Sequence, residues 1–182
     1  EMGADGVELD VQLSRDGELV VAHDETIDRV SNGTGYIKDY TLAQLKELSF
    51  NRLFPAFKDA RIPTLKEVYE LLKPGGLTVN VELKTGIILY PEIEEKVLAL
   101  TASMGMEDRV IYSSFCHPSL VRLKELDSGL KTGLLYSDGW IDAAAYGRHT
   151  VGVDALHPAL YHMQDPDLIP AARRQGLAVN VW

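Results

Sequence analysis

The sequence has a single cysteine, Cys116, and few basic residues. One thiol excludes an internal disulfide and a zinc cluster built from several thiolates. The 18 Lys and Arg residues are outnumbered by 27 Asp and Glu residues, which leaves a formal net charge of -9. This balance argues against nucleic acid or an anionic membrane as an obligatory partner. It still permits a small phosphate-containing substrate, because a bound cation can reverse the local charge.

Long apolar runs are also missing, so the sequence predicts no transmembrane segment, and its first five residues are not a signal peptide. The chain therefore predicts a cytoplasmic protein, although a signal peptide upstream of Glu1 would overturn that prediction. With 182 residues, 46% of them hydrophobic, the chain has the size of one domain and can bury a real core.

The residue pattern that is present alternates between strand and helix. Period-two and short apolar runs predict strands at 7–11, 19–22, 77–83, 110–115, 131–136, 153–157 and 177–182. Amphipathic spacing predicts helices at 41–48, 65–72, 91–104, 118–126, 141–148 and 165–175. Repeated βα units of this kind form a parallel sheet, either doubly wound or closed as a barrel.

The two faces of these strands favour the barrel. A central strand of an open parallel sheet is covered on both faces and is apolar throughout. Here each strand is apolar on one face and polar toward the C-terminal end of the other, as at Ser113 and Asn180. We therefore predict an α/β fold, a TIM (β/α)8 barrel, with roughly six of its eight βα units in one domain spanning 1–182.

Three acidic residues stand out on two of these strands. Glu8 and Asp10 share the face opposite Val7 and Leu9, and Glu82 has the same placement on a later strand. Acids are disfavoured inside strands and are costly to bury unpaired. Three carboxylates without thiolates or a histidine cluster predict a site for Mg²⁺ or Ca²⁺. The alternative is a buried ion-pair network with a lysine and an arginine.

Other residues near the same strand ends are candidates for binding and catalysis. His23 follows a short apolar strand, and beside the acids it is a candidate general acid or base. Lys84, two residues after Glu82, can grip a phosphate oxygen or pair with that acid. Phe115 and Trp182 end strands and can form an aromatic wall for a substrate. His157 can line the same mouth, but its pattern favours a structural role.

Four segments in this order resemble the glycerophosphodiester phosphodiesterases: GADGVELDVQLSRDGELVVAHDETIDR, IPTLKEVYELL, TVNVELK and VNVW. The similarity covers nearly the whole chain, and the combination of E-L-D, V-x-H-D and N-V-E-L-K is specific. It implies a TIM barrel with a small helical insertion at 26–76, after the second strand. It also implies one divalent metal and hydrolysis of glycerophosphodiesters to glycerol 3-phosphate and an alcohol.

Carried over by position, the resemblance implies that Glu8, Asp10 and Glu82 are metal ligands. His23 matches one of two acid/base histidines, Lys84 a basic residue near the phosphate, and Trp182 an aromatic residue at a strand end. The family's His-Arg-Gly motif, its Pro-Glu-Asn-Thr segment and its eighth strand do not occur in the sequence. We therefore expect flanking segments in the parent protein, and we expect this stretch alone to be inactive.

Two other functions stay open at this point. A lysophospholipase D or a sphingomyelinase D-like phosphodiesterase would share the barrel and the metal. A catalytically degenerate barrel that acts as a binding module would keep the fold without the reaction. The three acids and His23 argue against the second, and the missing His-Arg-Gly motif supports it.

Overall fold

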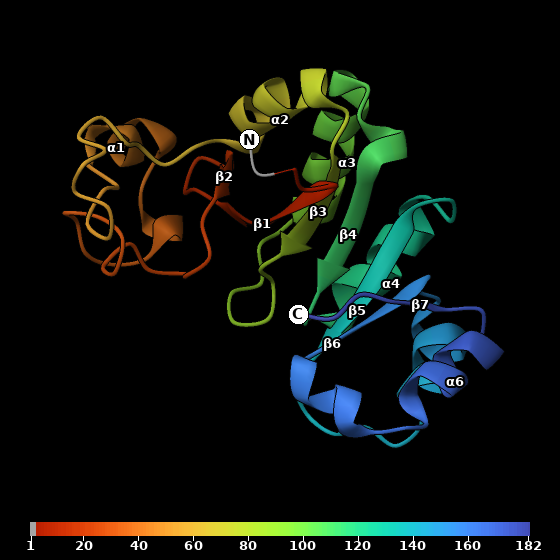
Figure 1. Cartoon of the computed structure of the whole chain (residues 1–182). Helices are drawn as coiled ribbons and strands as arrows, with labels where there is room; N and C mark the ends of the chain where they lie inside the picture. The colour runs from red at the N-terminus through yellow and green to blue at the C-terminus, as the bar shows by residue number, and fades with distance from the viewer. Residues whose placement is uncertain (1–2) are drawn as a thin grey trace.

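One curved sheet organises residues 3–182, the part of the chain that the computed structural model describes (Figure 1). Its strands are β1 (Gly6–Leu13), β2 (Leu19–Val21), β3 (Thr78–Leu83), β4 (Val110–Ser114), β5 (Lys131–Tyr136), β6 (Ala155–Pro158) and β7 (Ala178–Val179). Their order across the sheet is β2-β1-β3-β4-β5-β6-β7. Only β2 runs antiparallel, against β1, and each of the other neighbouring pairs is parallel.

Helices follow the strands; the first lies in a lobe beside the sheet, and the others cover the outer face of the sheet. They are α1 (Leu42–Glu47), α2 (Leu65–Leu72), α3 (Ile93–Met104), α4 (His117–Leu126), α5 (Ala143–Ala145) and α6 (Leu168–Arg174). Thr41 and Thr64 each start a helix with a capping box, in which side chain and backbone bond reciprocally. Gly105 ends α3 with φ at 60°, a left-handed conformation that glycine adopts readily.

The main core lies between the sheet and these helices. Val79, Val81 and Leu83 of β3 are at most 1% exposed and point toward the helices. The other parity of β3, which contains Asn80 and Glu82, points to the opposite face. Alternation along one strand therefore separates the core from the candidate site.

A second, smaller apolar cluster lies in a lobe beside the sheet, drawn in orange in Figure 1. It contains Val20, Ile27, Ile37, Leu45 and Ile62, each at most 1% exposed. The expected insertion at 26–76 includes this lobe, and its boundaries stay a prediction.

The base of this lobe is closed by the chain itself. The backbone of Val21 donates to Pro63 at 2.8 Å where the chain returns to α2. Helix α2 contributes to the main core, since Tyr69 lies there and bonds Thr101 of α3 at 3.0 Å.

Two expected elements differ in the structure. The helix expected at 141–148 is a single α-turn followed by a π-helical segment, Tyr146–Val151. The strand expected at 177–182 pairs regularly only at Ala178–Val179, although Trp182 still donates to Pro158 at 3.1 Å. Apolar spacing does not distinguish an α from a π turn, nor a strand from extended chain that bonds at intervals. The sequence pattern of residues 1–5 also predicts the end of a helix before the first strand, and residues 1–2 of that stretch fall outside the described residues.

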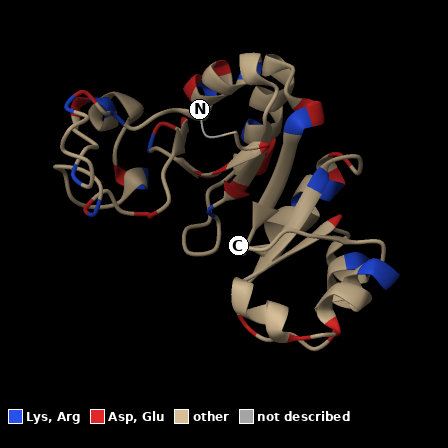
Figure 2. Cartoon of the chain, in the orientation of Figure 1, with Lys and Arg blue, Asp and Glu red and all other residues tan. Residues whose placement is uncertain are grey.

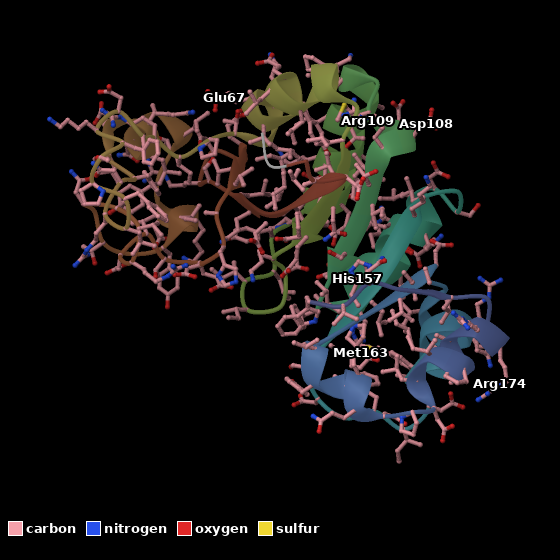
Figure 3. All side chains as sticks on the ribbon, in the orientation of Figure 1. Glu67, Asp108, Arg109, His157, Met163 and Arg174 are labelled. Atoms are coloured by element: carbon pink, nitrogen blue, oxygen red, sulfur yellow. The ribbon has the colours of Figure 1, made fainter. Side chains whose placement is uncertain are left out.

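The two ends of the parallel strands lie at opposite edges of the sheet. Figure 3 places Asp108 and Arg109 where β4 begins, and His157 toward the opposite end of the sheet. Charged residues lie mainly on helices and loops, with acidic residues also on β1 and β3 (Figure 2). The α/β fold predicted from the sequence is confirmed as a partial barrel, with six parallel strands among the described residues. Within residues 3–182, no helix combines the length and the apolarity needed to cross a membrane.

Candidate active site

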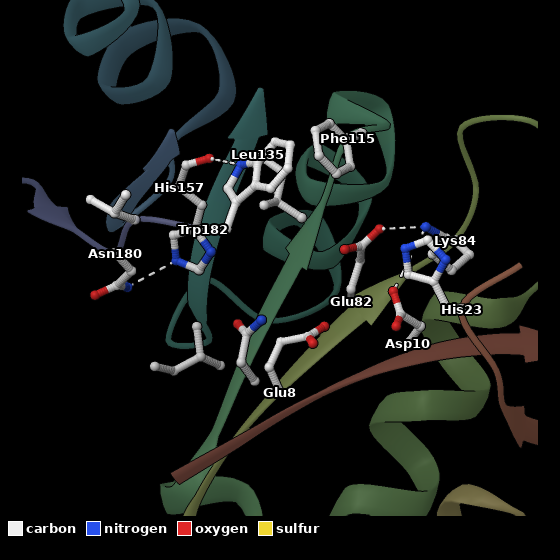
Figure 4. Close-up of a pocket in the computed structure, with 13 residues that line it drawn as sticks. Glu8, Asp10, His23, Glu82, Lys84, Phe115, Leu135, His157, Asn180 and Trp182 are labelled. Carbon is white, nitrogen blue, oxygen red and sulfur yellow. Dashed lines mark hydrogen bonds and ion pairs between the residues drawn. The ribbon is translucent and has the colours of Figure 1, made fainter. Parts of the chain in front are cut away.

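Neighbouring strands bring three carboxylates together. Asp10 of β1 is paired directly with Glu82 of β3, and Glu8 is paired with Asn80 one layer below. Parallel register and shared parity point all these side chains to the inner face (Figure 4). One carboxylate oxygen from each of Glu8, Asp10 and Glu82 lies within 4.8 Å of the others. The structure thus assembles the three acids that the sequence predicts as metal ligands, and their role stays a prediction.

The electrostatics of this cluster fit a cation. Partial burial, together with the charges of Asp10 and Glu82, raises the pKa of Glu8 to about 7. Burial also raises the pKa of Glu82, although Lys84 opposes that change. For Glu8, burial and the neighbouring carboxylates outweigh the positive charges of His23 and Lys84, so the pKa still rises. Three oxygen donors that share excess negative charge are the donor set that Mg²⁺ or Ca²⁺ prefers.

Lys84 lies against the same cluster. Its Nζ is 3.2 Å from Glu82 Oε1 and 3.7 Å from Asp10 Oδ1. Burial alone would lower the pKa of Lys84, but these two carboxylates outweigh it and raise the pKa above its usual value. The ammonium group is therefore charged, and it matches part of the alternative ion-pair network. One lysine against three acids leaves negative charge for a further cation to neutralise.

His23, from the loop after β2, is held through its neighbour. Its Nδ1 is 2.7 Å from Asp24 Oδ1, and Arg29 donates to both oxygens of Asp24 at 2.6 and 2.9 Å. Arg29 holds the pKa of Asp24 well below its usual range, so this carboxylate is ionised and accepts the Nδ1 proton. The other ring nitrogen, Nε2, is left for proton transfer. The His23 side chain is 67% exposed and lines the pocket.

A buried glutamine anchors the loop that carries His23. The Nε2 of Gln12, on β1, donates to the backbone oxygens of Ala22 at 2.9 Å and Asp24 at 2.7 Å. Its Oε1 accepts from the Tyr90 hydroxyl at 2.8 Å. Gln12 has no exposed surface, so its amide is fully paired inside the protein.

The remaining pocket wall is largely apolar. The pocket has a volume of about 520 Å³ and includes Ile111, Leu135 and Val181 beside the charged cluster. Phe115 and Trp182 meet edge to face there, with their ring centroids 5.4 Å apart. The structure brings both predicted aromatic residues to the pocket, and substrate contact by them stays a prediction.

Sequence reasoning passed over two residues that shape this site, Gln12 and Arg29, and it favoured a structural role for His157. Gln12 shares the parity of Glu8 and Asp10, so the period-two pattern contained a signal for it. Arg29 and His157 had no such signal, because their roles depend on partners brought together by folding. Another histidine, His117, has its Nε2 3.0 Å from the backbone oxygen of Leu135, in a structural bond.

These features define a β/α-barrel protein with an acidic, cation-type site in a pocket at the ends of its strands. The model of the glycerophosphoryl diester phosphodiesterase family matches residues 1–182. A glycerophosphodiester phosphodiesterase of Caldanaerobacter subterraneus is 44% identical, over 100% of this chain and 74% of its own length. The chain therefore belongs to the glycerophosphoryl diester phosphodiesterase family.

Solved structures agree with this assignment. A glycerophosphodiester phosphodiesterase from Agrobacterium tumefaciens is 31% identical and superimposes with a TM-score of 0.81, over 98% of this chain and 74% of that one. A phosphodiesterase from Oleispira antarctica, solved in complex with the product sn-glycerol-3-phosphate, is 27% identical with a TM-score of 0.83. That match covers 99% of this chain and 73% of the other.

Proposed function

We propose that this protein hydrolyses glycerophosphodiesters to glycerol 3-phosphate and an alcohol. The observation that carries the proposal is the convergence of Glu8, Asp10 and Glu82 within 4.8 Å, in a pocket that also holds His23 and Lys84, in a chain of this family. The relative that binds sn-glycerol-3-phosphate supports the same product.

Each charged residue has a role in this proposal. Glu8, Asp10 and Glu82 would hold one divalent cation, Mg²⁺ or Ca²⁺. Once bound, that cation supplies Lewis-acid polarisation of the phosphodiester. Lys84 binds a phosphoryl oxygen and stabilises the negative charge that develops there. Its present contacts with Glu82 and Asp10 place the ammonium group beside the cluster that the phosphate approaches.

His23 is assigned as the general acid. The ester bond from phosphorus to the leaving alcohol breaks, and the departing alkoxide takes the Nε2 proton of His23. The new bond to phosphorus comes from water, or first from the 2-hydroxyl of the glycerol group, in which case water then opens the cyclic phosphate to glycerol 3-phosphate. The proton lost by the attacking oxygen goes to the second histidine that the family resemblance implies for the parent protein. Asp24 fixes the ring by accepting from Nδ1, which aims Nε2 away from the loop.

The test is release of glycerol 3-phosphate from glycerophosphocholine by the full-length protein, with and without chelator. We expect release to stop on chelation and to return with Mg²⁺ or Ca²⁺. Glu82→Gln should weaken binding of Mn²⁺, followed by electron paramagnetic resonance, by at least about 100-fold, since even indirect partners of metal ligands cost 10–100-fold. Asp108→Asn, an exposed acid at the far end of β4, is the matched control. Full activity in chelator would contradict the proposal.

A lysophospholipase D activity is the second candidate. The loop after Lys84 exposes Ile87 by 76% and Leu89 by 79%, and Phe115 lies at the pocket with 39% exposed. An exposed apolar loop that follows the pocket residue Lys84 favours a substrate with an acyl chain. Assays of lysophosphatidylcholine beside glycerophosphocholine distinguish the two activities. Binding of glycerol 3-phosphate without turnover of either substrate would favour the binding-module alternative.

A further inference from the structure

A histidine and an asparagine form a hydrogen-bonded pair in the pocket, on β6 and the segment after β7. Asn180 Nδ2 lies 2.9 Å from His157 Nε2 (Figure 4). An amide nitrogen can only donate, so His157 Nε2 is the acceptor and the ring proton of the neutral imidazole is on Nδ1. The pair thus fixes one tautomer of the ring.

A glycine on the neighbouring strand makes room for this ring. A Cβ atom added to Gly133 of β5 would come within 2.1 Å of His157 Nε2 and 2.3 Å of its Cε1. The imidazole therefore lies directly over the glycine, where no other residue type leaves space. Trp182 Nε1 donates to the backbone oxygen of His157 at 3.0 Å and fixes the strand end as well. His157 is therefore held at three points. Its ring packs on Gly133, its Nε2 accepts from Asn180, and its backbone oxygen accepts from Trp182.

The second ring nitrogen is a donor that faces the pocket. His157 Nδ1 has no hydrogen-bond partner among residues 3–182, and the ring lines the same pocket as the three acids. Burial lowers the pKa of His157 to about 4, so the ring stays neutral near pH 7. Its surroundings include the apolar side chains of Ile111, Leu135 and Val181. An oriented N–H among apolar groups is suited to bind an acceptor on a ligand.

The ligand group that fits is a hydroxyl remote from the phosphate. The acid cluster and Lys84 attract the phosphodiester, and the glycerol 2-hydroxyl lies next to it. The terminal hydroxyl of glycerol extends farthest from the phosphate and needs a partner once it is desolvated. We propose that His157 Nδ1–H donates a hydrogen bond to that terminal hydroxyl, and that Asn180 and Gly133 are positioning residues for the bond. This inference rests on the proposed function.

Ligand binding by the full-length protein tests it with two probes. One is sn-glycerol 3-phosphate, and the other is 2-hydroxypropyl phosphate of matched configuration, which lacks only the terminal hydroxyl. We expect the wild type to prefer the first by about tenfold in calorimetric titration, the worth of one hydrogen bond. In His157→Phe, both probes should bind about as the second binds the wild type. The affinities of the wild type and the variant for inorganic phosphate should agree within about twofold, because this ion has no glycerol hydroxyl for His157 to bind.

Two further variants separate this role from a folding defect. Gly133→Ala should displace the ring and abolish the preference, whereas Gly139→Ala, where an added Cβ meets nothing within 4 Å, should keep it. Nitrogen-15 correlation spectra of His157 should show the proton on Nδ1 in the wild type, and Asn180→Asp should move it by presenting an acceptor to Nε2.

The outcomes are distinguishable. A wild type that releases glycerol 3-phosphate while His157→Phe keeps the tenfold preference overturns this inference alone, as does a proton found on Nε2. A wild type that neither binds sn-glycerol 3-phosphate nor releases it overturns the proposed function, and this inference falls with it.

Discussion

The side-chain amide of Gln12 donates to the backbone oxygen of Asp24 over 2.7 Å and so ties β1 to the loop that carries His23. The same amide accepts from Tyr90, far along the chain, at 2.8 Å. One buried residue two positions after Asp10 therefore sets the distance between the acid cluster and the histidine. The metal-ligand candidates and the proton-transfer candidate are linked through a single strand.

Replacing Gln12 should separate these two parts of the site. Gln12→Leu introduces an apolar side chain of similar size and leaves the Tyr90 hydroxyl and two backbone oxygens without their partner. We expect a loss of about 1–3 kcal/mol in the free energy of unfolding, because buried groups lose their hydrogen bonds. Turnover should fall by more than the loss of folded protein accounts for, because Gln12 no longer holds the loop that carries His23. Urea unfolding and glycerol 3-phosphate release measure the two effects.

Tyr90→Phe is the matched control for this prediction. It removes only the bond to Gln12 Oε1 and leaves the bonds from Gln12 to the loop intact. We expect a loss of about 1 kcal/mol and near-normal turnover. Equal effects of both substitutions on turnover would show that Gln12 does not position His23.

The proton-transfer role of His23 predicts a large kinetic effect. His23→Ala should lower kcat by about two to four decades, the usual contribution of a general acid or base. Asp24→Asn should lower it less, because the ring remains but loses the carboxylate that accepts from Nδ1. His149→Ala, at an exposed position, is the control and should be neutral. Near-normal turnover of His23→Ala would remove His23 from the mechanism.

The parity of single strands predicted much of this site from the sequence. Glu8, Asp10 and Glu82 share a face because side chains alternate along each strand, and parallel register then brings the strands together. Strand and helix alternation likewise predicted the parallel sheet, and the polar face of its strands favoured the barrel. Both inferences use patterns within one element or between consecutive elements.

Such patterns could not predict contacts between distant segments of the chain. His157 was assigned a structural role, because nothing in its own strand shows that Gly133 leaves room for its ring or that Asn180 bonds it. The bonds of Asp24 to both His23 and Arg29 likewise depend on how its loop folds back. Tertiary hydrogen bonds decide these roles.

Metal binding should stabilise the folded protein. A ligand that binds only the native state adds about 2.7 kcal/mol when present at 100 times its Kd. For a protein of this size, that corresponds to a rise in Tm of roughly 5–10 °C. Thermal unfolding with Mg²⁺, Ca²⁺ or chelator measures the rise, which Asp10→Asn should abolish and Asp108→Asn should preserve. An identical rise in Asp10→Asn would place the cation elsewhere.

Burial of His157 predicts a loss of stability in acid. Its pKa is about 4 in the folded protein and about 6.5 in an unfolded chain, so the unfolded state binds more protons between these values. The stabilisation from the neutral ring is therefore complete above pH 6.5 and is lost as the pH falls toward 4. Between pH 8 and pH 5 the loss from this one group should be about 2 kcal/mol.

Urea unfolding of wild type and His157→Gln at several pH values isolates the contribution of His157, since every other group titrates in both proteins. We expect the wild type to lose about 2 kcal/mol more than the variant over this range. Parallel pH profiles would mean that His157 has the same pKa in the folded and unfolded protein, so that burial does not hold its ring neutral.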